Sequence, residues 1–235
     1  MPTFLLPEFI DPLFAPFHPP NFRHWWGTDE LGRDVLVRLL FGTSYSLIFA
    51  IPVSFLTTTL AVILGALIGY LPKRLRIVTL GFSDVLNSLP LYPILLIALA
   101  IYPGQLLAVA IIKIILGWPH LAQLIYMESE LMKGSPMILS AKSQGLSPWR
   151  IGAYFVAPQI MESVKGYFPL LLYSNIFLLS ALDYFGLGFP IPTPSLAESF
   201  RQFQENPTAW WLFLLPLAVV TALLQGFRTM GNRND

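Results

Sequence analysis

Four ionisable residues stand inside long apolar stretches of this sequence, namely Asp84, Lys113, Lys165 and Asp183. A charged side chain at the centre of a bilayer costs roughly 2.5–3.5 kcal/mol, so a residue of this kind commonly lines a solute or ion path. Lys165 and Asp183 fall near the ends of their stretches, from which a charged group reaches the membrane interface. Asp84 and Lys113 are therefore the candidates for a translocation path, and Lys113 is the deeper of the two.

Catalytic chemistry is not indicated by any residue pattern. Two intramembrane aspartates could share a proton, as in an intramembrane aspartyl protease, but Asp84 and Asp183 are expected near opposite faces of the membrane. The sequence has no G-x-x-x-x-G-K-[ST] loop, G-x-S-x-G elbow or H-E-x-x-H pair. It has no Cys, and its His residues are too widely spaced for a local metal motif. We therefore expect no enzyme, no metal site and no cofactor.

The composition indicates a membrane protein. Only 11% of the 235 residues are charged, and 55% are hydrophobic. Soluble domains average about 25% charged residues, because a water-facing surface needs them. An integral membrane protein is therefore predicted, with the lipid bilayer around it. The net charge of +1 and the absence of basic runs argue against nucleic acid as a partner.

Five apolar segments are long enough to cross about 30 Å of hydrocarbon as helices. They lie near residues 46–70, 79–102, 105–127, 164–185 and 210–227. Lys and Arg gather after the first, third and fifth of these spans, which places those segments and the tail 228–235 in the cytoplasm. The predicted fold is all-α, a polytopic transmembrane helix bundle over residues 46–227. In this arrangement Asp84 is close enough in sequence to pair with Arg74 or Arg76.

The residues before the first span are expected on the outer side. Residues 1–27 are apolar but interrupted by Pro and acidic residues, so they resemble neither a signal peptide nor a span. Residues 28–42 predict an amphipathic helix in the membrane interface, with Asp29 as its N-cap. Acid-to-base pairs at i,i+4, Asp29–Arg33 and Asp34–Arg38, favour this helix. A solvated charged face with no further role is the alternative.

Residues 128–158 form the one long polar interruption between spans. A Gly-Ser-Pro break at 134–136 precedes a short helix, Gly145 is placed as its C-cap, and Ser147-Pro148 begins another helix. Pro158 is expected where the chain turns back to the membrane. An ordinary surface loop is the alternative, but loops of about 30 residues inside a compact domain are usually functional.

Four segments together resemble a known family. Ser140-Ala141-Lys142, then Gly145 and Pro158, resemble the "EAA" loop of binding-protein-dependent ABC importer permeases. Residues 24–42, 117–125 and 182–195 resemble segments of the dipeptide, oligopeptide and nickel subfamily, in the same order and at compatible spacing. Ala141, Gly145 and Pro158 match this motif, whereas Ser140 and Lys142 stand where it has Glu and Ala. The resemblance implies an ATPase-coupling loop of Ser140, Ala141, Lys142, Gly145, Leu146, Ser147, Arg150 and Pro158. The positions expected near the outer face are Gly27, Thr28, Asp29, Gly32, Arg33, Asp34, Gly186, Gly188, Pro192, Pro194 and Ser195.

The resemblance implies a type I ABC importer half of the second-permease type, in a bacterial-type inner membrane. Its implied partners are a second permease subunit, two ATP-binding subunits that hydrolyse the ATP, and an extracytoplasmic solute-binding protein. The implied solute is a peptide or a similar small molecule, and the loop would couple to the ATPases. Family members commonly have an additional first span and a Glu where Ser140 stands. A degenerate, non-transporting scaffold or regulatory relative is therefore the alternative.

Overall fold

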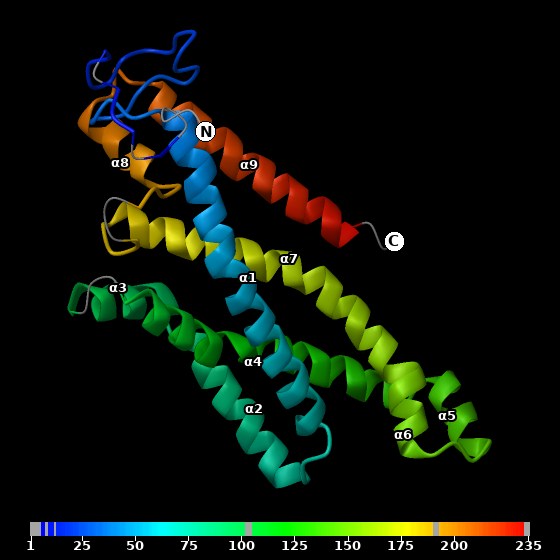
Figure 1. The fold of residues 1–235 in the computed structure, drawn as a ribbon. Coiled ribbons are helices and arrows are strands. Elements are labelled where there is room, and N and C mark those ends of the chain that lie inside the picture. Colours follow the sequence, from blue (N-terminus) through cyan, green and yellow to red (C-terminus); the bar gives the residue numbers. More distant parts are fainter. Residues whose placement is uncertain (1–5, 8, 12, 102–104, 190–192, 233–235) are drawn as a thin grey trace. The chain divides into compact units, whose positions relative to one another are not determined.

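The computed structural model describes the chain except residues 1–5, 8, 12, 102–104, 190–192 and 233–235. The described part is helical, and its pairings of extended backbone are two isolated bridges, Ile10–Arg33 and Thr28–Asp34. In chain order (Figure 1) the elements are α1 (Val35–Ile68), α2 (Lys73–Ser88), α3 (Leu91–Ile101), α4 (Leu106–Lys133), α5 (Pro136–Ser143), α6 (Pro148–Ile151), a π-helix (Gly152–Val156), α7 (Ala157–Tyr184), α8 (Glu198–Glu205) and α9 (Trp211–Asn232). The all-α prediction is confirmed.

The chain divides into two compact units, which are described separately below. Unit 1 comprises Met1–Ile51, Tyr92–Ala108 and Leu172–Phe227, and unit 2 comprises Pro52–Leu91, Val109–Leu171 and Arg228–Asp235. Long helices such as α1 and α7 contribute residues to both units.

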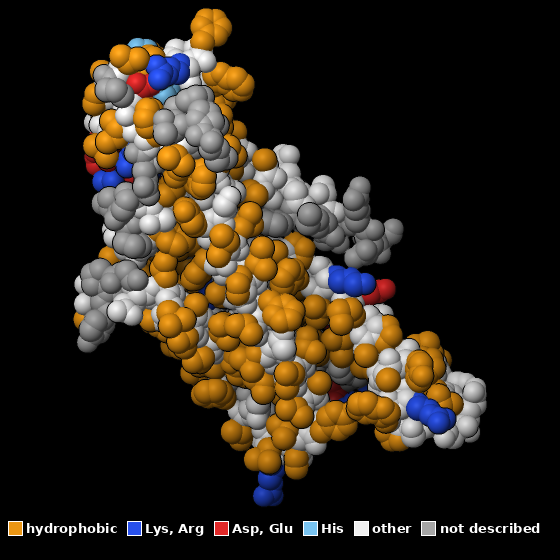
Figure 2. All heavy atoms as spheres, viewed as in Figure 1, with side chains coloured by type: hydrophobic (Ala, Val, Ile, Leu, Met, Phe, Trp, Pro, Cys, Tyr) orange, Lys and Arg blue, Asp and Glu red, His pale blue; other side chains and the backbone are white. Residues whose placement is uncertain are grey.

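One helix covers each of four expected spans, and the second, 79–102, is divided between α2 and α3, which meet at an angle of 65°. The helices differ in length and hydropathy. By length and hydropathy α1 and α4 could each cross a bilayer, and α2 with α3 would make a third span if the two are one broken helix. The apolar part of α9, Trp211–Leu223, is shorter. Hydrophobic side chains cover most of the face drawn in Figure 2. A lipid-facing surface explains this cover, since water would require charged groups instead.

The prediction of an interfacial helix over residues 28–42 is wrong for its first half. The helix begins only at Val35 and then continues to Ile68. Gly32 has φ +73°, a left-handed conformation that no α-helix contains. Asp34 rather than Asp29 provides the cap, because its Oδ1 accepts a hydrogen bond from the Val37 N–H at 2.9 Å.

Two further boundaries differ from the expectation. Pro158 does not mark a turn, because it lies in the first turn of α7, which follows the π-helix without a break. A π-helix absorbs one extra residue, so the missing N–H of a proline after it is tolerated. The tail expected from residue 228 is helical as far as Asn232, because α9 continues through it.

Unit 2 is held together where α1 and α4 approach closely. A Cβ added to Gly65 would lie 2.7 Å from the backbone oxygen of Ala122, so only glycine permits this contact. Beside it, Ala61, Leu121, Ala122 and Ile125 form a fully buried cluster. Small residues at such crossings let membrane helices pack backbone to backbone, which fixes α1 against α4.

Candidate functional site

The polar interruption between α4 and α7 folds into a compact two-helix structure, here called the α5–α6 knob (residues 134–156, Figure 1). Helix α5 begins at Ser135, whose Oγ accepts from the Ile138 N–H at 3.4 Å, and Pro136 occupies its first turn. Helix α6 begins in the same way at Ser147, whose Oγ accepts from the Arg150 N–H at 3.5 Å. Each start uses a Ser cap and a Pro at the first helical position. The sequence predicts this start for α6, whereas it predicts residues 134–136 only as a break before the first short helix.

Gly145 ends α5 in a left-handed turn with φ +78°. Its N–H donates to the Lys142 carbonyl at 3.0 Å, and the N–H of Leu146 donates to the Ala141 carbonyl at 3.1 Å. These two bonds define a Schellman motif, which reverses the chain and leads it into α6. The predicted C-cap is therefore confirmed, and nothing but open space surrounds the position of a Cβ at Gly145.

The knob has a small hydrophobic core of its own. Ile138 and Ala141 on α5 and Ile151 on α6 are buried, and Leu146 and Phe155 pack against them. The inward position of Ala141, which is 5% exposed, leaves space only for a small side chain. The core and the capped turn make the knob a rigid projection rather than a loose loop.

Large apolar side chains cover the outside of the knob. Trp149 is 83% exposed and Tyr154 73%, and Met137 and Leu139 are about half exposed. Lys142 and Arg150 lie among them, both exposed. An exposed Trp among other apolar side chains, rimmed by basic residues, is typical of a protein–protein contact surface.

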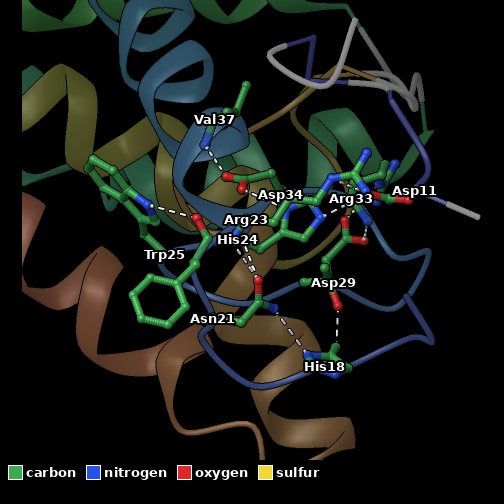
Figure 3. Close-up of polar contacts among 12 residues, drawn as sticks. Asp11, His18, Asn21, Arg23, His24, Trp25, Asp29, Arg33, Asp34 and Val37 are labelled. Carbon is green, nitrogen blue, oxygen red and sulfur yellow. Dashed lines mark hydrogen bonds and ion pairs between the residues drawn. The ribbon is translucent and has the colours of Figure 1, made fainter. Parts of the chain in front are cut away.

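A second group of functional candidates is a buried charge network in unit 1 (Figure 3). His24 lies between two carboxylates, with its Nδ1 2.8 Å from Asp34 Oδ2 and its Nε2 3.3 Å from Asp11 Oδ2. Arg23 also contacts Asp11, at 3.0 Å. Burial raises the pKa of the Asp11 carboxyl, but the Leu13 N–H, His24 and Arg23 together outweigh it, so this pKa lies below its ordinary value.

A second buried charge group in unit 1 reaches α8. Asp29 Oδ2 lies 2.6 Å from Arg33 Nε, which confirms the pair expected from the sequence, although the pair lies in a turn and not in a helix. Arg33 and Arg38 both contact Glu198, at 3.3 and 2.5 Å. The expected pair between Asp34 and Arg38 is not made, because Arg38 turns to Glu198 and Asp29 while Asp34 caps α1.

The two segments expected near the outer face lie against each other in unit 1. A Cβ at Gly42 would lie 2.8 Å from the Ser195 backbone, and the Trp211 indole N–H donates to the Thr28 carbonyl at 3.2 Å. Gly27, at φ +67°, has no room for a Cβ beside His18 and Trp211. Gly186 is also left-handed, Pro194 and Ser195 are buried, and Pro192 lies outside the described residues.

Asp183 supports the turn after α7. It is buried, and its Oδ1 accepts from the Phe189 N–H at 2.8 Å across a turn in which Gly188 leaves no space for a side chain. Asp183 is therefore held within the protein, and its expected place near a membrane interface stays a prediction. Lys165, in contrast, is exposed.

The two candidates for a translocation path both lie in unit 2. Lys113 is buried in α4 at 6% exposure. Asp84 is exposed and accepts a hydrogen bond from Gln123 Nε2 at 2.7 Å. The expected pairing of Asp84 with a basic residue is wrong, because Arg76 contacts Glu130 at 3.5 Å. Sequence reasoning missed Gln123, and also Asp11 and Glu198, since no periodicity marks a partner from a distant element.

Comparisons with known proteins identify similar chains. A family model described as "Binding-protein-dependent transport system inner membrane component" matches residues 61–233. The inner membrane ABC transporter permease protein YejE of Escherichia coli (strain K12) is 31% identical over 207 residues, which cover 88% of this chain and 60% of that protein. The oligopeptide transport system permease protein OppC of Bacillus subtilis (strain 168) is 26% identical over 215 residues, which cover 91% of this chain and 70% of OppC.

A third relative, the peptidoglycan transport system permease protein YejE of Agrobacterium fabrum, is 27% identical over 86% of this chain and 53% of its own length. The chain thus spans only 53–60% of the two YejE proteins. Among solved structures, inward-facing MetNI methionine ABC transporter matches with a TM-score of 0.62 at 15% identity, over 83% of this chain and 95% of that one. At this identity the match shows a shared fold, in agreement with the predicted type I importer architecture.

Proposed function

Because the chain belongs to the family of binding-protein-dependent transport system inner membrane components, we propose that it is the permease subunit of an ATP-driven importer for peptides. The apolar helices and the permease relatives make it a multi-pass inner membrane protein. One of these relatives, OppC, is named an oligopeptide transport permease, which supports peptides as the solute here. Hydrolysis of ATP belongs to separate subunits.

The α5–α6 knob carries this proposal. A rigid knob fixed between two membrane helices can transmit force, whereas a flexible loop cannot, and its outside bears the exposed Trp149, Tyr154 and Met137 that a protein partner would cover. We assign the knob to the contact with an ATP-binding subunit. Its Lys142 and Arg150, with Lys73, Arg74 and Arg76 at the start of α2, favour the cytoplasm for this end.

The proposal of an importer permease subunit also implies the remaining partners. A single subunit presents only part of a solute path, so a second permease subunit completes it. The N-terminal network of unit 1 then belongs to the outer side, where an extracytoplasmic solute-binding protein delivers peptide. The closed hydrogen bonding of that network gives the outer segment a fixed shape for such a contact.

Purification of the tagged chain from its native membranes tests the proposal. A permease subunit should bring down a second permease and ATP-binding subunits, and the reconstituted complex should import radiolabelled trialanine when ATP is present. Recovery of the chain without an ATP-binding subunit would contradict the proposal. A complex that forms but imports nothing would instead favour the non-transporting scaffold.

A further inference from the structure

Helices α2 and α4 of unit 2 are joined by a seam of polar contacts. At the basic end Arg76 lies 3.5 Å from Glu130 and stacks over the Tyr126 ring at 5.8 Å. Farther along the same seam, Gln123 Nε2 donates to Asp84 Oδ1 at 2.7 Å, and Asn87 Nδ2 donates to Gln123 Oε1 at 3.3 Å. We call Asp84, Asn87 and Gln123 the carboxylate–amide cluster.

Helix geometry places the carboxylate–amide cluster well away from the charged end of the seam. Along α2 Asp84 stands beyond Arg76, and along α4 Gln123 stands before Glu130, in each case by roughly 10–12 Å at 1.5 Å per residue. The hydrocarbon core is about 30 Å thick. Charged residues such as Arg76 and Glu130 belong at its edge, which puts the cluster about a third of the way across.

The cluster is nevertheless exposed on this subunit. Asp84 and Asn87 are both exposed, and α2 ends one residue later, at Ser88, before the exposed Leu89 and Pro90. Polar side chains at this depth face a bundle interior or a water-filled cavity. Non-helical backbone is tolerated there only under the same condition. The exposed carboxylate and amide therefore indicate that this side of α2 does not face lipid.

The opposite side of α2 has the reverse character. Val78, Phe82 and Val85 are 68, 56 and 58% exposed and lie on one face at helical spacing. This face is suited to lipid. Ile77, seven residues before Asp84, is 59% exposed on the side of the cluster, so the exposed Asp84 and Asn87 themselves locate the side that other protein or water must cover.

We propose that the carboxylate–amide cluster lines the solute path and holds the protonated amine of the transported peptide. Asp84 accepts one hydrogen bond from Gln123, and an ionised carboxylate has about four acceptor positions, which leaves room for an ammonium group with its three donors. The Gln123 amide, itself held by Asn87, orients the carboxylate toward the exposed side. This assignment names the feature of a peptide that the proposed importer recognises within the membrane, and it rests on that function.

Thiol labelling tests the site without any knowledge of the solute. The chain has no Cys, so Asn87→Cys introduces a single thiol into the full complex, provided that the partner subunits are made cysteine-free. A methanethiosulfonate bearing trimethylammonium should label it roughly tenfold faster than the sulfonate reagent, because Asp84 attracts the cation. Adding Asp84→Asn should remove that preference, and Val85→Cys on the lipid side should stay unlabelled. Absence of labelling in Asn87→Cys, or a preference that survives Asp84→Asn, would overturn the proposal.

Uptake separates the solute amine from a basic side chain of the second permease, the other cation that Asp84 could meet. In reconstituted complexes Asp84→Asn should slow import of trialanine roughly tenfold at low concentration and leave N-acetyl-trialanine unchanged. Equal loss for both peptides, with subunits that separate on size exclusion, would assign Asp84 to the subunit interface and overturn the proposal. If the unmodified importer carries neither peptide, the proposed function fails, while the labelling result still decides whether the cluster lines an aqueous path.

Discussion

Arg38 Nη2 lies 2.5 Å from Glu198 Oε2, and this contact ties the start of α1 to α8 across 160 positions of the chain. Both side chains are largely buried, and Arg33 and Asp29 complete the group. Removal of one partner from such a buried group leaves a charge without compensation, which is far more costly than the loss of a surface pair.

Arg38→Ala should therefore lower the free energy of unfolding by about 3 kcal/mol. Thermal unfolding of the detergent-solubilised complex would measure the effect as a fall in Tm. The control is Arg201→Ala, which removes the exposed Arg201–Glu205 pair on α8 and should cost about 0–1 kcal/mol. Equal effects of the two substitutions would show that the network does not stabilise unit 1.

Asp11→Asn should make stability less sensitive to acid. The pKa of the Asp11 carboxyl is held below the unfolded value of 3.8, so its ionised form stabilises the folded state at higher pH. This stabilisation is fully present above the unfolded pKa and is lost as the pH falls through the folded pKa. Unfolding temperatures measured from pH 7 to pH 3 should show wild type above Asp11→Asn at neutral pH, with the two converging below about pH 4. A difference that persists unchanged at the acid end of this range would contradict this role.

Substitutions at Gly145 should impair coupling in the order Val, Ala, Asn. The left-handed φ of +78° is the obstacle, since space around a Cβ is open, and Asn tolerates this conformation best. We expect Gly145→Val to abolish most peptide-stimulated ATP hydrolysis and Gly145→Asn to retain most of it. Gly152→Ala, in the π-helix at φ −57°, provides the control. Full stimulated hydrolysis in Gly145→Val would show that the turn is not needed.

Trp149→Ala should weaken capture of the ATP-binding subunit without destabilising the chain. The indole is 83% exposed, so its loss removes little internal packing, while an aromatic anchor at an interface contributes about 2 kcal/mol or more, roughly a thirtyfold change in affinity. Quantitative co-purification measures the change. Trp25→Ala, which removes an indole that is 72% exposed in unit 1, should leave capture unchanged. Retention of the subunit by Trp149→Ala would exclude this surface as the contact.

Local signals could be interpreted from the sequence, and long-range ones could not. Gly145 and Ser147 act within four residues of themselves, so their roles as caps followed from residue type and spacing. The spacing of the charge pairs in residues 28–38 also predicted a helix. The structure differs because Arg38 pairs with Glu198 and because Gly32 adopts a left-handed conformation that ends any helix there. A partner that lies 160 residues away overrides a local preference, and no periodicity predicts it.

The candidate functional residues show the same difference between local and long-range signals. The depth of Asp84 was visible as a charge in an apolar segment, whereas its partner Gln123 was not, because a single neutral amide in a helix has no pattern. Arg76, two turns before Asp84 on α2, was a plausible ion-pair partner for Asp84. In the structure Arg76 instead forms an ion pair with the Glu130 carboxylate on α4. Only the packing of α2 against α4 decides which pair forms.

One cross-linking measurement tests the central claim most directly, namely that the α5–α6 knob contacts an ATP-binding subunit. Ser147→Cys, in this chain without native Cys, would carry a maleimide photocross-linker in native membranes. The account predicts a cross-linked product that contains an ATP-binding subunit, and a thiol that reacts only with reagents applied from the cytoplasmic side. A thiol at this position that reacts from the outer side, or that forms no product with an ATP-binding subunit while the complex remains intact, would contradict it.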